Sequence, residues 1–330
     1  MNKQRDNTLD LLKGFAIFLV VLGHINVATQ VENFIYSFHM SLFMFISGCT
    51  FWYSYKKSEN AIAYIWTRFL ALIIPYIMWG FFYYWFYSNN KFVVVDFINY
   101  PFSSSFFDRL WFLPTLYIII VIATIAMAVT KQSEGVKRVF LQVVLYSFGI
   151  CLLALFYKLT NIKLFRQSII YTLPFFVGLF FMQYDSFKQF CTKQFFLLLC
   201  ILLFVLCFSF YSVDDKSAIS LASRLICGIS SVIPLYVCVN HNNKLYYNSV
   251  WGGRIAMLGK NTIAVYPMQE FFRSLFNNSL QNIFYDTILK VFSAILICVI
   301  TVFIKQFIET ISPVLSFFMF GTKLKRKQEN

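Results

Sequence analysis

The sequence is poor in charge. Of its 330 residues only 13% are charged, whereas an ordinary soluble domain has about 25%. Hydrophobic residues make up 59% of the chain and aromatic residues 21%. A soluble protein of this length has no core large enough to hide so much apolar surface. This composition excludes a soluble enzyme, a disordered chain and a small disulfide scaffold.

Histidine is also scarce, with three residues, and the eight cysteines contain no C-x-x-C pair. Most cysteines lie inside apolar stretches, so we expect them to behave as small buried hydrophobes and to form neither disulfides nor metal sites. The His and Cys residues have no spacing typical of metal ligands, and no glycine-rich phosphate loop is present. The sequence therefore predicts no metal site and no bound cofactor.

Long apolar runs dominate what remains. A membrane-spanning helix needs about 20 mostly apolar residues, and ten segments approach this. They are 9–29, 34–52, 69–87, 111–130, 139–157, 168–183, 195–212, 219–239, 256–276 and 287–309. We predict an all-α integral membrane protein: a single bundle of about ten transmembrane helices. Residues 1–330 form one domain in this interpretation, with a short basic tail from about residue 321. The ninth segment contains Asn261 and Pro267 and is expected to be broken or re-entrant.

The formal net charge of +14 comes from basic residues that lie between the apolar runs. Their distribution favours a topology with both termini in the cytoplasm, since most of them then lie on the inner side. The charge is thus explained by membrane orientation, and no nucleic-acid partner is expected. Basic residues in the tail suit anionic lipid headgroups, so membrane lipid is an expected partner.

Ionisable residues inside spans are costly and are candidates for function. The first segment contains Asp10, Lys13 and His24. At 100° per residue, Lys13 and His24 return to within ~20° of each other, and Asp10 lies within ~40° of His24. If the segment is one helix, the three share a face, with Lys13 near the inner edge and His24 about 16 Å farther out. Alone, Lys13 is also explained as an inner anchor whose side chain extends to the interface.

His39 lies near the start of the second segment. Counted from the outer ends of the two segments, His24 and His39 have similar depths, so we expect the two imidazoles to lie close together. Histidine is the side chain best suited to move a proton near neutral pH. The alternative is two unrelated structural histidines that hold helices together. His241 is expected to be solvated in a cytoplasmic loop.

The remaining polar candidates form two layers. On the outer side they are Asp108, Arg109 and Trp111 before the fourth segment, and Gln269, Glu270 and Arg273 late in the ninth. On the inner side they are Arg68 and Lys260, which with Lys13 suit an anionic ligand with phosphates. Simpler explanations remain open for them. Arg68 and Lys260 fit positive-inside anchoring, and Glu270 fits an i,i+3 salt bridge with Arg273.

Five motifs appear in the order found in membrane-bound acyltransferase family 3, which the chain resembles from about residue 7 to residue 270. They are NTLDLLKG…VVLGH (7–24), FHMSLFMFISG (38–48), RFLALIIPY (68–76), LWFLP (110–114) and GKNTIAVY (259–266). Members of the family open with a basic residue, ten intervening positions and a histidine, a spacing that Lys13 and His24 match. The family usually has Arg where Lys13 stands, and commonly has a His near the position of Gln269.

The resemblance implies an O-acetyltransferase, which moves an acetyl group from cytoplasmic acetyl-CoA to a hydroxyl of a cell-surface or lipid-linked polysaccharide. It implies a multi-pass location in the bacterial cytoplasmic membrane. In this interpretation His24, with His39, takes the proton from the attacking hydroxyl, and Lys13, Arg68 and Lys260 hold the CoA phosphates. Asp10, Arg109, Trp111, Gln269 and Glu270 would support the site or face the glycan acceptor.

Two other classes remain open. A transporter or flippase for a sugar or a lipid-linked glycan also suits ten spans with a broken helix near the midplane, although the chain shows no sign of two related halves. A structural membrane protein that organises polysaccharide synthesis is the third. The alignment of ionisable residues in the first segment and the five motifs favour the acyltransferase.

Overall fold

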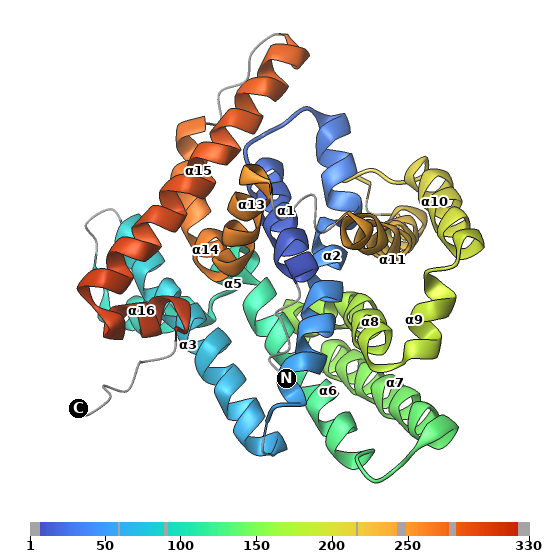
Figure 1. The fold of residues 1–330 in the computed structure, drawn as a ribbon. Helices are drawn as coiled ribbons and strands as arrows, with labels where there is room; N and C mark the ends of the chain where they lie inside the picture. Colours follow the sequence, from blue (N-terminus) through green and yellow to red (C-terminus); the bar gives the residue numbers. More distant parts are fainter. Residues whose placement is uncertain are drawn as a thin grey trace. The chain divides into compact units, whose positions relative to one another are not determined.

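The computed structural model describes residues 7–58, 60–88, 92–215, 217–242, 249–276 and 282–322. In these ranges the chain is helical and contains no strand, as predicted (Figure 1). The basic tail at 323–330 lies outside the described residues. The long helices are α1 (Asn7–Gly23), α2 (Thr29–Tyr55), α3 (Ala61–Tyr87), α6 (Phe112–Val129), α7 (Gly135–Thr160), α8 (Lys163–Gln183), α10 (Gln194–Phe208), α11 (Ala218–His241) and α15 (Ile283–Ile311).

Shorter helices connect these or break them. They are α4 (Val94–Asn99), η1 (Tyr100–Phe102), α5 (Ser104–Leu110), α9 (Asp185–Cys191), α13 (Val250–Lys260), α14 (Thr262–Arg273), η2 (Ser274–Phe276) and α16 (Pro313–Phe320). The segment between the third and fourth predicted spans is thus three short helices, α4, η1 and α5, which periodicity alone did not reveal.

Seven of the described helices are long and apolar enough to cross a membrane, and α9 with α10, bent by 64°, adds an eighth. The two other predicted spans are helical but shorter. The first ends after 17 residues, and the ninth is interrupted at Asn261 between α13 and α14. The predicted break in the ninth segment is confirmed. The membrane-protein fold class is also confirmed, with fewer uninterrupted spans than the ten expected.

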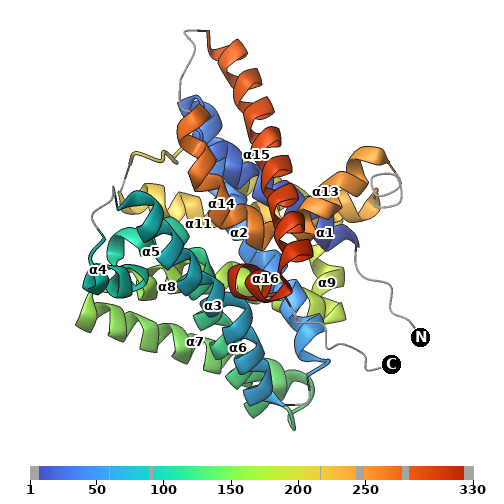
Figure 2. The same cartoon turned by 90° about the vertical axis from the view of Figure 1, so that its left-hand side faces the viewer.

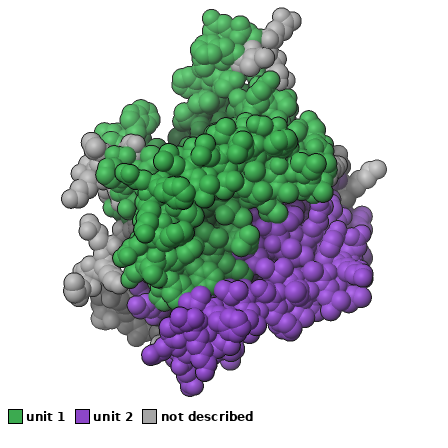
Figure 3. Space-filling model, turned by 90° about the vertical axis from the view of Figure 1, so that its right-hand side faces the viewer, with its two compact units in different colours: residues 1–52, 173–304 green, residues 53–172, 305–330 purple. Residues whose placement is uncertain are grey.

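The chain divides into two compact units (Figure 3). The first consists of residues 1–52 and 173–304, and the second of residues 53–172 and 305–330. Helices α2, α8 and α15 each begin in one unit and end in the other. The two units are described separately below.

The first unit is held together by close approaches of helix backbones. A Cβ added at Gly48 of α2 would overlap the carbonyl oxygen of Phe175 in α8, and a Cβ added at Gly178 of α8 would overlap that of Phe45 in α2. Small residues at both contact points let two apolar helices touch along their main chains, which is how helices associate where lipid supplies no hydrophobic drive. Cys49 adds a hydrogen bond from its thiol to the carbonyl oxygen of Gly178 at 3.4 Å.

The second unit is built around α3. The indole of Trp79 in α3 donates to the carbonyl oxygen of Met319 in α16 at 2.8 Å, so the C-terminal helix is fastened to it. Residues Tyr76 and Tyr83 of α3 pack their rings against Phe106 of α5. Helix α7 is fastened to α6 by Gln142, whose amide donates to Thr130 Oγ1 at 3.2 Å.

The cysteines are all free. Five of them are buried, as expected, but Cys151 and Cys238 are exposed on the surfaces of α7 and α11, against the prediction. Both lie in helices apolar enough to span a membrane. A small thiol on such a surface adds little polarity, so exposure there is physically inexpensive.

Candidate functional site

The candidate site of the first unit begins where α1 ends. The helix stops at Gly23, and His24 lies in the following turn. The backbone N–H of His24 donates to the carbonyl oxygen of Val21 at 3.2 Å. The predicted single helix over 9–29 is therefore wrong at its outer end. His24 is the first residue after the helix, so its rotation departs by only about 20° from the one predicted for a continuous helix. Asn26, with φ of 51°, completes the turn.

Two side chains of α2 lie beside His24. The ring centroid of Tyr36 is 6.4 Å from that of His24 and 5.0 Å from that of His39. Tyr36 also donates a long hydrogen bond of 3.4 Å from its hydroxyl to the carbonyl oxygen of Gly23. The structure thus brings both histidines against one tyrosine.

The two histidines do not lie at the matching distances from the ends of their helices that the sequence had suggested. Helix α2 begins at Thr29, so His39 lies ten residues, or about 15 Å, along it. His24 stands at the very end of α1. Both rings border Tyr36 because Gly23 lies against Ile35 and Tyr36, about one turn before His39, and α2 therefore extends past the end of α1.

The ring of His39 is oriented by its own helix. Its Nδ1 lies 2.7 Å from the carbonyl oxygen of Ile35. A carbonyl oxygen only accepts, so Nδ1 carries the hydrogen and donates it. In the neutral ring the Nε2 atom is then an acceptor, the form that a general base requires. The side chain is 2% exposed, so its surroundings fix this arrangement.

Helix α14 completes the cluster from a distant part of the chain. The side chain of Gln269 and the charges of Glu270 and Arg273 all act electrostatically on the ring of His24. Two buried atoms at this point, His24 Nδ1 and Gln269 Oε1, have no hydrogen-bond partner among the described residues. Glu270 and Arg273 form the expected i,i+3 salt bridge at 3.5 Å. The cluster therefore retains polar atoms that are available to a bound molecule.

Sequence analysis missed two members of this cluster. Tyr36 was hidden among many tyrosines, and Arg224 of α11 was not among the candidates. The charge of Arg224 acts on both Tyr36 and His39. An arginine inside a helix apolar enough to span a membrane was the signal that would have found it, because such residues are rare unless they serve a site.

The inner candidates lie where α1 and α13 cross. A Cβ at Gly14 would overlap the carbonyl oxygen of Ile255, and a Cβ at Gly259 would overlap that of Asp10. These two glycines let the helices touch along their backbones. The pairing runs antiparallel, so the end of α13, with the exposed Lys260, lies beside the start of α1. Asp10 is buried and Lys13 is part-buried on α1.

Asn261 turns the chain between these two ends of the site. It is buried, and its amide donates to the carbonyl oxygen of Met257 at 2.7 Å. Helix α13 runs toward Asp10, whereas α14 leads away from it to reach His24 through Gln269. The sequence led us to expect that Lys260 opens a span, and it does not. It ends α13 just before the reversal.

The second unit holds the other predicted inner residue. Arg68 is the eighth residue of α3 and does not open the helix, because α3 begins at Ala61, with Asn60 as its N-cap. Its guanidinium carbon is 4.8 Å from the centroid of the Tyr64 ring. Its Nε atom is buried and has no hydrogen-bond partner among the described residues.

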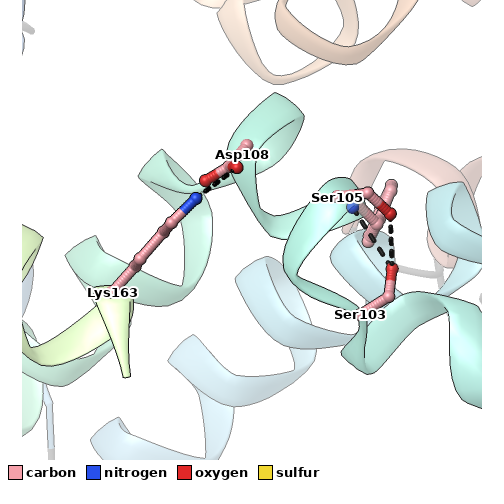
Figure 4. Close-up of polar contacts among 5 residues, drawn as sticks. Ser103, Ser105, Asp108 and Lys163 are labelled. Atoms are coloured by element: carbon pink, nitrogen blue, oxygen red, sulfur yellow. Dashed lines mark hydrogen bonds and ion pairs between the residues drawn. The ribbon is translucent and has the colours of Figure 1, made fainter. Parts of the chain in front are cut away.

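The outer candidates of the second unit are largely engaged with neighbours. Arg109 lies over the ring of Tyr87 at 5.0 Å, and Trp111 stacks on Tyr171 with centroids 5.0 Å apart and planes at 23°. Asp108 pairs with Lys163 at 2.5 Å (Figure 4). One face of Trp111 is therefore covered by Tyr171, and the ring of Phe112 also lies beside it, with centroids 6.3 Å apart.

The third histidine stands apart from the site. His241 is exposed at the last residue of α11, rather than in a loop. Within the described ranges, no group of three or more His, Cys, Asp or Glu residues is arranged to hold a metal ion.

A family model described as an acyltransferase domain matches residues 6–306. This match extends over most of the chain and includes all five motifs listed above. No curated protein and no solved structure matches the chain.

Proposed function

We propose, from the premise that this chain belongs to membrane-bound acyltransferase family 3, that it is an O-acetyltransferase of the bacterial cell envelope. It would move an acetyl group from cytoplasmic acetyl-CoA to a hydroxyl of a cell-surface or lipid-linked polysaccharide. Family membership supports acyl transfer, and the long apolar helices support a multi-pass membrane location. The donor, the acceptor and the bacterial cytoplasmic membrane are parts of the proposal.

The observation that carries the proposal is the cluster of His24, Tyr36, His39 and Gln269 in the first unit. It contains two imidazoles, and one of them has its tautomer fixed by a backbone carbonyl. Such a pairing of an acceptor nitrogen with a defined donor is what a general base needs. Ionisable groups of this kind are rare within apolar helices unless they do chemistry.

The chemical step is a transfer from a thioester to an oxygen ester. The acceptor hydroxyl oxygen forms a bond to the acetyl carbonyl carbon, and the bond from that carbon to the CoA sulfur breaks. His24 takes the proton from the hydroxyl, and the same proton leaves with the CoA thiolate. Gln269, whose side chain acts on the His24 ring, would help to position it, and His39, which packs against Tyr36, would serve as a second proton carrier.

Positive charge at the other end of the first unit suits the donor. Lys13 and Lys260 lie near the crossing of α1 and α13, on the side that the charge distribution predicts to be cytoplasmic. Ammonium groups there favour the CoA phosphates. Asp10, buried beside them, would position Lys13. In the second unit, Arg109 and Trp111 are proposed for the glycan side, where aromatic faces suit sugar rings.

The test is NMR of surface polysaccharide purified from four strains: wild type, a deletion, the deletion with His24→Ala, and the deletion with His241→Ala. We expect O-acetyl signals to be lost in the deletion and the His24→Ala strain, and kept in the control strain. His241 is the matched control because it is an exposed histidine outside the cluster. Unchanged O-acetylation in the deletion strain would contradict the proposed function.

A second candidate function is transport of a sugar or a lipid-linked glycan. The reversal at Asn261 favours it, because interrupted helices with buried polar residues line many transporter sites. Unchanged acetylation together with altered amounts of exported polymer in the deletion strain would support this candidate instead.

A further inference from the structure

Three helix ends meet at one end of the second unit. Helix α2 finishes at Tyr55, α3 starts at Ala61, and α7 starts at Gly135 after the α6–α7 turn. In both ribbon views the start of α3 and the α6–α7 turn lie at the same end (Figures 1 and 2). The charge distribution predicts that this end is cytoplasmic.

Two tyrosines, Tyr55 and Tyr64, pack together in this region. The rings of Tyr55 and Tyr64 meet edge to face, with centroids 5.4 Å apart. Ser54 and Tyr64 share a hydrogen bond of 2.7 Å between their hydroxyl oxygens. Tyr64 is 4% exposed, so its ring is a fixed surface. Arg68, one turn farther along α3, lies over that ring.

A second arginine, Arg138 of α7, acts on this region. Its charge acts on Tyr55, the neighbour of Tyr64. Like Arg68, it has a buried Nε atom with no hydrogen-bond partner among the described residues. Neither arginine forms an ion pair with a described acidic residue. Two guanidinium groups therefore flank one pair of tyrosines without a carboxylate to neutralise them.

The position of Arg138 on its helix strengthens this arrangement. It lies in the first turn of α7, whose N-cap residue, Glu134, gives no side-chain cap. The N-terminal end of a helix is positive, so a cation there is unfavourable for the helix itself. Its presence is physically reasonable if an anion binds at this point, because the helix end and the guanidinium then act together.

We propose that Arg68 and Arg138 form an anion site for the phosphate groups of the acyl donor. This inference rests on the proposed function and adds Arg138, which the sequence motifs do not single out. Planar guanidinium groups bind phosphate through paired N–H donors, and the unpartnered Nε atoms are the donors that such a ligand would satisfy. A phospholipid headgroup carries the same chemistry and is the competing source.

The test is CoA binding to the full-length protein in detergent, measured by isothermal titration calorimetry, for wild type, Arg138→Gln and Lys137→Gln. Lys137 is the matched control, since it is an exposed cation one residue away on the same helix. We expect Arg138→Gln to weaken CoA binding about 10- to 100-fold and Lys137→Gln to change it by less than about twofold. Inorganic pyrophosphate should compete with CoA on wild type and lose its effect on Arg138→Gln.

Three results separate the explanations. Equal CoA affinity in wild type and Arg138→Gln, both with unchanged thermal unfolding midpoints, would overturn the inference while leaving acyl transfer intact. Loss of co-purified anionic phospholipid from Arg138→Gln, with CoA affinity unchanged, would assign the site to lipid and also overturn it. If Arg138→Gln unfolds, Arg138→Lys replaces it, and we expect intermediate CoA affinity because the charge remains without the planar fork. Wild type that neither binds CoA nor transfers acetyl groups would contradict the proposed function itself.

Discussion

His39 donates a hydrogen bond from Nδ1 to the carbonyl oxygen of Ile35 at 2.7 Å. This bond fixes which nitrogen of the neutral ring carries the hydrogen, and it leaves Nε2 as an acceptor. The ring is packed edge to face against Tyr36, which also borders His24. The two histidines are thus linked through one aromatic ring, and each can be tested separately.

We expect His24→Ala to reduce acetyl transfer by about 10²- to 10⁴-fold, the range for loss of a general base. CoA affinity should stay within about twofold, because His24 lies at the opposite end of α1 from Lys13. The measurement is transfer of radiolabelled acetyl groups in membranes, with CoA binding followed in parallel. Turnover close to that of wild type would rule out His24 as the base.

Replacing His39 by Asn separates its two possible roles. The Asn amide can still donate near the position of Nδ1, and so keep the bond to Ile35, but it supplies no basic nitrogen. We expect His39→Asn to fold with a normal unfolding midpoint and to lose at least about tenfold in rate if His39 carries protons. A wild-type rate in this variant would show that His39 only holds α2 in place.

Tyr36→Phe and Tyr36→Ala form a matched pair. The phenylalanine variant loses only the 3.4 Å hydrogen bond to Gly23, which is long and worth less than about 1 kcal/mol. We expect its rate to fall by less than about fivefold. The alanine variant removes the ring that both imidazoles border, and its rate should fall much further. Equal rates in the two variants would mean that the ring does not organise the site.

Lys13→Ala should raise the KM for acetyl-CoA by about tenfold while kcat falls by less, since a cation near the inner end binds phosphate without entering the reaction. Lys13→Arg keeps the charge and should keep most of the affinity. Steady-state kinetics in proteoliposomes measure both constants. An unchanged KM in Lys13→Ala would leave Lys13 as an anchor at the membrane interface.

Because α1 and α13 cross closely, we expect alanine substitutions at two glycines of α13 to have different effects on stability. Gly259→Ala places a methyl group where the carbonyl oxygen of Asp10 lies and should destabilise the protein by about 1–3 kcal/mol. Gly253→Ala meets no atom within 4 Å and should be neutral or stabilising by up to about 1 kcal/mol. Thermal unfolding in detergent compares them, and equal midpoints would contradict the close backbone contact.

The sequence by itself determined the class and most of the helices. Apolar runs of about 20 residues form helices in lipid, because every backbone N–H and C=O group must find its hydrogen-bond partner within the segment. It also indicated the break near Asn261 and singled out His24, His39 and Gln269 as candidate site residues. These follow from local composition and from the five motifs, which do not depend on how the helices pack.

Only the tertiary structure decided how those residues meet. Periodicity fixes faces within a helix, but the end of α1 at Gly23 depends on the turn that joins α2, and His24 lies in this turn rather than inside a helix. The contact of Gln269 with His24 joins positions 245 residues apart, and no local pattern fixes such a distance. The effect of Arg138 on Tyr55 likewise joins positions 83 residues apart, on α7 and α2. Packing of distant helices, rather than the character of any one helix, assembles both candidate sites.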